Sequence, residues 1–197
     1  MDTDFLIRKN LNYHFGFPWS HFVIDDFFPE ECFREFQARL CKVRDGYLKR
    51  ENDAFDLNFK ILPDFALARF FLSDEFQNFL EQLTKSRLSI FEGGLVQLRL
   101  MTPDSPAFVP HVDEQDEKSL VCIFYLSDWT LGKGGELNLL KDKESDPNGP
   151  TSKIIEPKAN RMVLFFSEDT HWHSVNRTQN WYRYSIISEW IVEEGVL

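Results

Sequence analysis

Apolar positions divide the chain into a helical first part and a strand-rich second part. From Phe33 to Val43 apolar residues recur at steps of three and four, which predicts a helix with one buried face. Residues 63–72 and 73–83 are expected to form two further helices. Ser73 is a candidate N-cap of the last one, because its hydroxyl can accept a hydrogen bond from the first helical turn.

After Gly93 and Gly94 the pattern changes to short segments rich in branched and aromatic residues, separated by Gly, Pro and Asn. Seven such segments in a row favour a mainly β fold with a jelly-roll core, the double-stranded β-helix also found in cupins. The N-terminal helices are then expected to flank one of its two sheets. The predicted strands lie at 95–101, 119–126, 135–140, 153–156, 161–166, 171–176 and 182–192, with a short earlier strand at 21–24.

Two polar stretches are expected to be loops. Residues 141–151 (KDKESDPNGPT) have the composition of a hairpin loop, and residues 44–60 are expected to be a mobile excursion. The length of 197 residues suits one domain, with helical support over about 1–92 and the jelly-roll core over about 93–192.

Composition supports a packed globular chain. Hydrophobic residues make up 43% and aromatic residues 15%, and 20 residues are Phe, which excludes a disordered composition. The formal charge is −10, from 32 acidic and 22 basic residues. Such a surface repels phosphate backbones, so we expect no nucleic-acid partner.

The three cysteines show no C-x-x-C spacing, which argues against a disulfide framework or a structural zinc site. The beginning of the chain lacks the basic and apolar regions of a signal peptide. The longest apolar runs, such as 162–166, are too short to span a bilayer. These features predict a soluble cytoplasmic protein without a membrane partner.

The candidate chemistry begins at the sequence Pro110-His111-Val112-Asp113. On an extended backbone residues i and i+2 point to the same side, so His111 and Asp113 can approach one ion together. His173 can supply a second imidazole. Two imidazoles and one carboxylate bind one face of iron(II) and leave other positions open. Taken alone, H-x-D is a weak signal, because such pairs more often form a surface hydrogen bond.

Further residues strengthen this interpretation. Arg183 and Ser185 share one face of a predicted strand, and an arginine with a hydroxyl can hold a carboxylate. Tyr125 can add a phenol hydrogen bond to the same carboxylate. The simpler alternatives are a surface arginine and a core tyrosine.

The order of these parts is more specific than any one of them. A strand with H-x-D is followed by Tyr125-Leu126, Gly134-Gly135-Glu136-Leu137, Pro157, Asn160-Arg161, Phe165-Phe166, a histidine and Arg-x-Ser. This pattern resembles the iron(II)- and 2-oxoglutarate-dependent dioxygenase superfamily, in its prolyl-4-hydroxylase-like branch. The segment 24–30 (IDDFFPE) resembles the opening of that branch, so the resemblance covers about residues 20–192.

The resemblance implies a set of residues and cofactors. It makes His111, Asp113 and His173 the ligands of Fe(II), the metal and catalytic residues. O2 and the co-substrate 2-oxoglutarate complete the reaction, with ascorbate as a candidate reductant. The implied co-substrate residues are Arg183 for the distal carboxylate, Tyr125 and Ser185 as helpers, and Leu137 and Leu164 along the channel.

Two positions leave alternatives. Some relatives carry a co-substrate tyrosine on the strand before H-x-D, where this chain has Met101, and Gln97 or Arg99 are candidates to replace it. His171 competes with His173 as the third ligand, although the W-H-S-V setting of His173 fits the family better.

The implied activity is hydroxylation of an unactivated C–H bond with release of succinate and CO2. Asp113 argues against halogenation, because halogenases of the superfamily carry a small residue there. The substrate is expected to be a prolyl residue in a peptide or protein, or alternatively a free amino acid or another small metabolite. The acidic run 113–117 suggests a cationic group on the substrate, unless it is only a solvated loop. A non-catalytic jelly-roll binding module is the alternative from another class.

Overall fold

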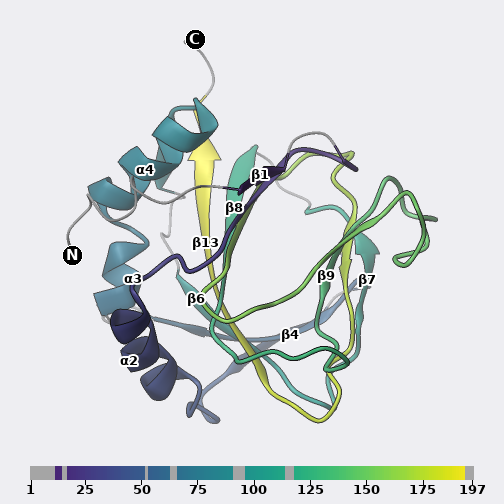
Figure 1. Cartoon of the computed structure of the whole chain (residues 1–197), viewed down its shortest axis with the longest axis horizontal. Helices are drawn as coiled ribbons and strands as arrows, with labels where there is room; N and C mark the ends of the chain where they lie inside the picture. The colour runs from purple at the N-terminus through teal and green to yellow at the C-terminus, as the bar shows by residue number, and fades with distance from the viewer. Residues whose placement is uncertain are drawn as a thin grey trace.

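The structure, a computed structural model, describes residues 12–14, 17–51, 53–62, 66–90, 96–113 and 118–193. Antiparallel strands form two sheets that enclose a barrel, and the helices stand on the outer side of the larger sheet (Figure 1). The expected fold class, a mainly β jelly roll with flanking N-terminal helices, is confirmed.

The larger sheet forms one wall of the barrel. Among the described residues it has nine strands in the order β1-β2-β11-β8-β13-β6-β4-β3, with β5 paired to β13. Its strands are β1 (Asn12–His14), β2 (His21–Ile24), β3 (Leu48–Glu51), β4 (Asp56–Ile61), β5 (Leu88–Ile90), β6 (Gln97–Met101), β8 (Ser119–Tyr125), β11 (Met162–Phe166) and β13 (Arg183–Val192).

The smaller sheet forms the opposite wall and, in the described part of the chain, has four strands in the order β10-β9-β12-β7. All seven strands expected after Gly94 are present, and β7 is an eighth that the sequence pattern did not predict. Its strands are β7 (Phe108–His111), β9 (Leu137–Leu139), β10 (Lys153–Ile155) and β12 (His173–Val175).

Helices α2 (Glu30–Leu40), α3 (Ala66–Phe70) and α4 (Asp74–Thr84) stack along the outside of the larger sheet (Figure 1). The apolar face expected for α2 is buried. Ser73 caps α4 as predicted, since its Oγ accepts a hydrogen bond from the backbone N–H of Phe76 at 3.2 Å. No helix in the described ranges is long and apolar enough to cross a membrane.

The alternation of side chains along β8 produces two separate apolar layers. Phe124, like every second residue of the strand, faces the helices and packs in a cluster of phenylalanines. Tyr125 and its alternate neighbours Val121 and Ile123 face the barrel interior. Both faces are therefore apolar, which explains why the strand reads as a continuous hydrophobic run.

The polar segment 44–60 differs from the prediction. It contains β3 and β4, which extend the larger sheet beyond β6, so the expectation of a mobile excursion is wrong. All four residues of β3 are exposed, because β3 is the edge strand and buries neither face. The stretch 141–151 connects β9 to β10 as a loop, as expected.

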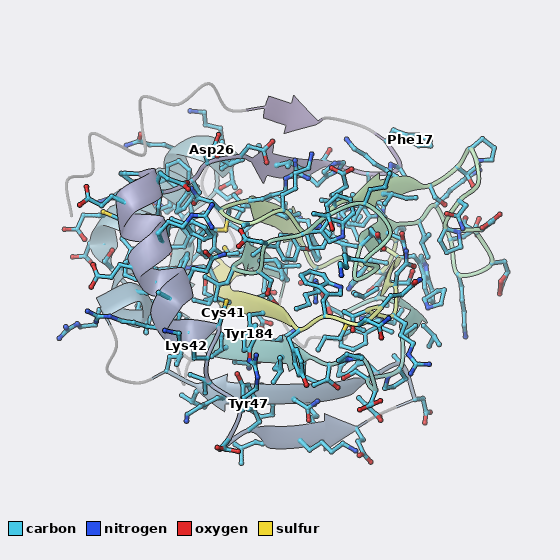
Figure 2. All side chains as sticks on the ribbon, turned by 60° about the horizontal axis from the view of Figure 1, so that its bottom comes forward. Phe17, Asp26, Cys41, Lys42, Tyr47 and Tyr184 are labelled. Carbon is cyan, nitrogen blue, oxygen red and sulfur yellow. The ribbon has the colours of Figure 1, made fainter. Side chains whose placement is uncertain are left out.

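The end of α2 is tied to the central strand β13. Figure 2 shows Tyr184 and Tyr47 close to Cys41 at this end of the helix. The Tyr184 hydroxyl donates a hydrogen bond to the carbonyl of Val43 at 3.0 Å. Because Arg183 precedes Tyr184, this bond holds the start of β13 in place. Cys41 and the other two cysteines are free thiols, in agreement with the sequence.

Candidate active site

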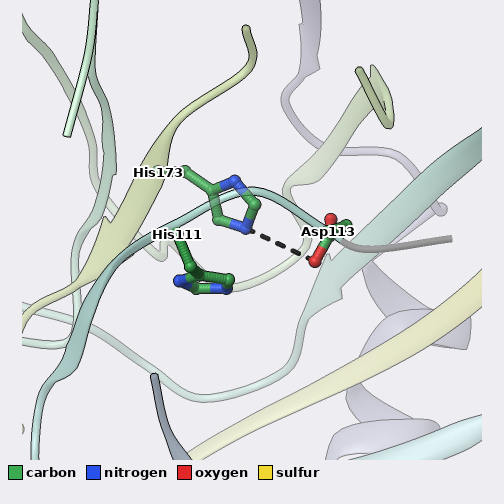
Figure 3. Close-up of side chains that lie close together, drawn as sticks. All are labelled: His111, Asp113 and His173. Carbon is green, nitrogen blue, oxygen red and sulfur yellow. Dashed lines mark ion pairs between the residues drawn. The ribbon is translucent and has the colours of Figure 1, made fainter. Parts of the chain in front are cut away.

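Three candidate ligands converge at one end of the barrel. His111 ends β7, Asp113 follows it, and His173 opens β12 directly opposite His111 in the register of the two strands. The imidazole centroids of His111 and His173 are 4.3 Å apart, and one ligand atom from each of the three residues lies within 4.8 Å of the others (Figure 3). The donor set suits iron(II), because it leaves one face of the ion open.

Backbone carbonyls orient both imidazoles. The Nδ1 of His111 lies 2.8 Å from the Val109 carbonyl oxygen, and the Nδ1 of His173 lies 3.0 Å from that of His171. A carbonyl only accepts, so each Nδ1 carries the proton and donates it. The lone pair is then on Nε2, which in His173 lies 3.7 Å from Oδ1 of Asp113. This is the arrangement in which supporting hydrogen bonds fix a metal-binding tautomer.

The electrostatics of the cluster favour neutral imidazole. Burial is the main cause that lowers the pKa of His111, and the neighbouring His173 lowers it further. A neutral imidazole is the form that binds a metal ion. The lowered pKa of His111 therefore favours the form of its imidazole that can act as a metal ligand.

His171, the competing third ligand, lies outside this cluster. Its Nδ1 is 2.7 Å from the Phe166 carbonyl, and its ring stacks on Trp19 at a centroid distance of 4.4 Å. Its Nε2 lies 3.6 Å from Oε2 of Glu168. These contacts give His171 a packing role and leave His173 as the imidazole that faces Asp113.

A cavity of about 1340 Å³ runs between the two sheets, next to the cluster. Arg183 lines it and is only 7% exposed, with its Cζ 5.0 Å from the centre of the Tyr125 ring. Among the described residues, the Nε of Arg183 and the hydroxyl of Tyr125 have no hydrogen-bond partner. A buried cation and hydroxyl without partners are costly, and a bound carboxylate would satisfy both.

Gly135 makes room for the arginine, a role that the sequence analysis did not assign. Its φ of +78° is strained for residues with a side chain, and a Cβ there would lie 2.9 Å from Cδ of Arg183. The Gly134-Gly135 pair, noticed only as part of a pattern, thus contributes to the arginine pocket. A positive φ beside a buried side chain could not be deduced from the amino-acid sequence alone.

The remaining predicted residues fall on two faces. Ser185 and Leu137 line the cavity, whereas Leu164 packs in the layer under the helices. The expectation that Leu164 lines the channel is therefore wrong, and its neighbour Phe165 lines the cavity instead. Met101 lies directly opposite Arg183 in the register of β6 and β13, so the missing tyrosine leaves a thioether beside the arginine.

The connection between β3 and β4 covers the histidine cluster, which the sequence did not reveal. The ring of Phe55 lies 5.4 Å from that of His111 and 5.2 Å from that of Phe108. The carbonyl of Ala54 accepts a hydrogen bond from the N–H of Val109 at 2.9 Å. A segment far from H-x-D in sequence thereby forms part of the cavity wall.

The fold is a double-stranded β-helix, and its site brings two histidines and one carboxylate together as candidate metal ligands. Residues 96–192 match the 2OG-Fe(II) oxygenase superfamily, and the chain belongs to this superfamily of oxygenases. The cofactors expected from the sequence, iron(II) and 2-oxoglutarate, are those of the superfamily. The buried arginine and the His, Asp, His donor set fit both of them.

Solved structures of the superfamily share the fold. A prolyl-4-hydroxylase from Pseudomonas putida is 18% identical with a TM-score of 0.67, and the match covers 98% of this chain and 97% of that one. A prolyl hydroxylase from Trichoplax adhaerens, in complex with a hypoxia inducible factor peptide fragment, is 18% identical with a TM-score of 0.63, covering 88% and 84%. HygX from Streptomyces hygroscopicus, with nickel and 2-oxoglutarate bound, is 11% identical with a TM-score of 0.63, covering 88% and 83%. No curated protein matches the sequence.

Proposed function

We propose that the protein hydroxylates an unactivated C–H bond of an organic substrate. The reaction consumes O2 and 2-oxoglutarate and releases succinate and CO2. One observation carries this proposal: His111, Asp113 and His173 line the same cavity as the buried Arg183, whose Nε has no hydrogen-bond partner among the described residues. The cavity thus offers a metal site and a carboxylate site to one bound molecule.

In this proposal His111, Asp113 and His173 hold iron(II). Bound iron(II), together with 2-oxoglutarate, would supply the activation of O2. The carboxylate of Asp113 partly neutralises the ion, and the two Nδ1–H donors keep the imidazole rings in a binding orientation.

Arg183 binds the distal carboxylate of 2-oxoglutarate in this proposal. A charge-assisted hydrogen bond from a buried guanidinium is stronger than one between neutral groups. Tyr125 and Ser185 lie opposite each other in the register of β8 and β13, next to Arg183, and serve as helpers. Leu137 contributes an apolar contact from the facing sheet.

The cavity wall between these charged ends is largely apolar. Ile123, Phe165 and Ile187 line it from the larger sheet, and Val175 lines it from the smaller sheet. An apolar wall excludes water from the reacting carbon and strengthens the electrostatic interactions within the site.

Two substrate classes follow from different observations. Similarity to prolyl hydroxylases supports a prolyl residue in a peptide or protein. A free amino acid or another small metabolite is supported by the charged residues Arg99 and Glu189 on the cavity wall. The acidic run 113–117 does not help to choose between these substrate classes, because residues 114–117 lie outside the described part of the chain.

Anaerobic addition of iron(II) and 2-oxoglutarate tests the proposal. We expect a weak visible charge-transfer band that is absent in Asp113→Ala, followed in air by succinate formation that this variant lacks. Exposed Asp142→Ala, on the loop between β9 and β10, is the matched control. If the natural protein neither takes up iron nor shows the band, it is not an enzyme of this kind. A metal-free binding module would then be the better explanation.

A further inference from the structure

A second arginine, Arg99, faces the cavity from β6. It lies opposite Ser185 of β13 and opposite Phe59 of β4 in the strand register. Its alternate neighbours Leu98 and Leu100 pack under the helices, so the strand directs Arg99 into the barrel. Arg99 is half-buried and lines the cavity.

The guanidinium of Arg99 is directed away from that of Arg183. Its Nε donates a hydrogen bond to Oε1 of Gln97 at 3.1 Å. Gln97 lies opposite Ile187, whereas Arg183 lies opposite Met101 at the other end of β6. The register of β6 and the bond to Gln97 therefore place the two arginines at different parts of the cavity.

The charges around Arg99 come from the metal site and from the far part of β13. Asp113 and Glu189 stabilise its positive charge, while Arg183 and Arg50 oppose it, and burial lowers its pKa. Electrostatically, Arg99 also acts on His111. Arg99 also lines the same cavity as the three candidate metal ligands, where the reacting carbon of a substrate would lie.

Most hydrogen-bonding capacity of this guanidinium is unused. Arginine carries several N–H donors in a planar fork that matches a carboxylate. Among the described residues, Arg99 makes one hydrogen bond, to Gln97. A half-buried guanidinium with unused donors, on the wall of a cavity, can bind an anionic ligand that enters this cavity.

Few molecules in the reaction can supply an anionic group to Arg99. One carboxylate of 2-oxoglutarate is assigned above to Arg183, and the other end chelates the metal. We propose that Arg99, held by Gln97, binds a free carboxylate of the substrate itself, so that the enzyme acts on a small carboxylic acid of the free amino acid class. This inference rests on the proposed function. An internal residue of a protein chain has no such carboxylate at its backbone.

Acidic residues in the same cavity further restrict the charge of the substrate that can bind. Asp53, Asp169 and Glu189 also line it. They disfavour a substrate with several negative charges and suit an ammonium group at a distance from the carboxylate. A zwitterion therefore matches the cavity better than a dicarboxylate or a phosphorylated compound.

Binding to the protein loaded with Ni(II) and 2-oxoglutarate tests the proposal without turnover. Calorimetric titration with the standard free amino acids, including proline, is compared with titration of their carboxamides and of acetylated, amidated prolyl peptides. We expect at least one free acid to bind at least about tenfold more tightly than its carboxamide, the order of one charge-assisted hydrogen bond. This comparison needs no variant and so does not depend on a variant that folds.

Arg99→Gln is then expected to remove the preference for the acid over the carboxamide, with the affinity for 2-oxoglutarate unchanged. Arg39→Gln, which removes an exposed arginine of α2, is the matched control that keeps the preference. Equal binding of acid and carboxamide, binding of no free acid, or a loss of 2-oxoglutarate affinity in Arg99→Gln would each overturn the proposal. The anaerobic band with iron(II) and 2-oxoglutarate tests the proposed function separately, because it forms without substrate.

Discussion

The ring of Phe55 lies 5.4 Å from the imidazole of His111, so the connection between β3 and β4 packs directly against the metal site. This contact joins the edge of the larger sheet to β7 of the smaller one. It also removes water from His111, whose pKa is lowered mainly by burial. Each of the following predictions depends on such a contact between distant parts of the chain.

Phe55→Ala is expected to weaken metal affinity by hydrating His111. The loss should be smaller than the roughly tenfold or greater effect of removing a hydrogen-bonded supporting residue, because Phe55 contacts His111 through its ring. Competition with a chromogenic chelator measures the affinity. Leu131→Ala, which shortens an 89% exposed side chain, is the control, and an equal change in both variants would contradict a specific role of Phe55.

His173→Ala is expected to abolish stoichiometric iron binding, whereas His171→Ala should retain it. His171 stacks on Trp19 and contacts Glu168, so its removal should lower the melting temperature instead. Iron content after anaerobic reconstitution and a thermal melt separate the two effects. Retention of iron by His173→Ala together with loss in His171→Ala would exchange the roles of the two histidines.

Arg183→Gln is expected to raise the Kd for 2-oxoglutarate by about 10- to 100-fold, the order of a charge-assisted hydrogen bond. Tyr125→Phe removes one neutral donor and should cost less, about 2- to 10-fold. Anaerobic titration of the visible band with 2-oxoglutarate gives both values. An unchanged Kd in Arg183→Gln would show that the distal carboxylate binds elsewhere.

The stability of the metal-free protein should depend on pH through His111. Its pKa in the folded chain is below the usual 6.5, so folding favours the neutral imidazole. This contribution is present above about pH 6.5 and is lost as the pH falls through the lower folded pKa. Urea unfolding in chelator at about pH 7.5 and about pH 5.5 should therefore show a smaller drop for His111→Asn than for the natural protein. An identical drop would assign the pH dependence to other groups.

Phe124→Ala is expected to destabilise the fold by about 3–5 kcal/mol, the usual cost of deleting a buried phenylalanine ring. Phe124 is fully buried and makes ring contacts with Phe28 and Phe33, which join the sheet to α2. Urea unfolding measures the free energy. Phe17→Ala serves as the control, since Phe17 is 48% exposed, and a similar loss there would exclude a special role of the aromatic layer.

The sequence anticipated the elements whose burial leaves a periodic or compositional trace. The strands β6, β8, β11 and β13 are apolar because they lie between the helices and the barrel interior, and α2 has a one-sided apolar pattern because it covers one sheet. The edge strand β3 has no apolar pattern in the sequence, because all of its side chains are exposed. The strand β7 was missed because it is short, its residues are half-buried or exposed, and it contains Pro110.

The sequence by itself also determined the local unit of His111 and Asp113, because alternation on an extended backbone fixes which residues share a face. It did not determine the face of Leu164, because β11 is apolar on both sides and periodicity then carries no information. Only the tertiary structure decided that His173 rather than His171 faces Asp113, that Phe55 covers His111, and that Arg99 turns from Arg183. These relationships depend on strand register and loop packing, which arise from contacts between residues far apart in the chain.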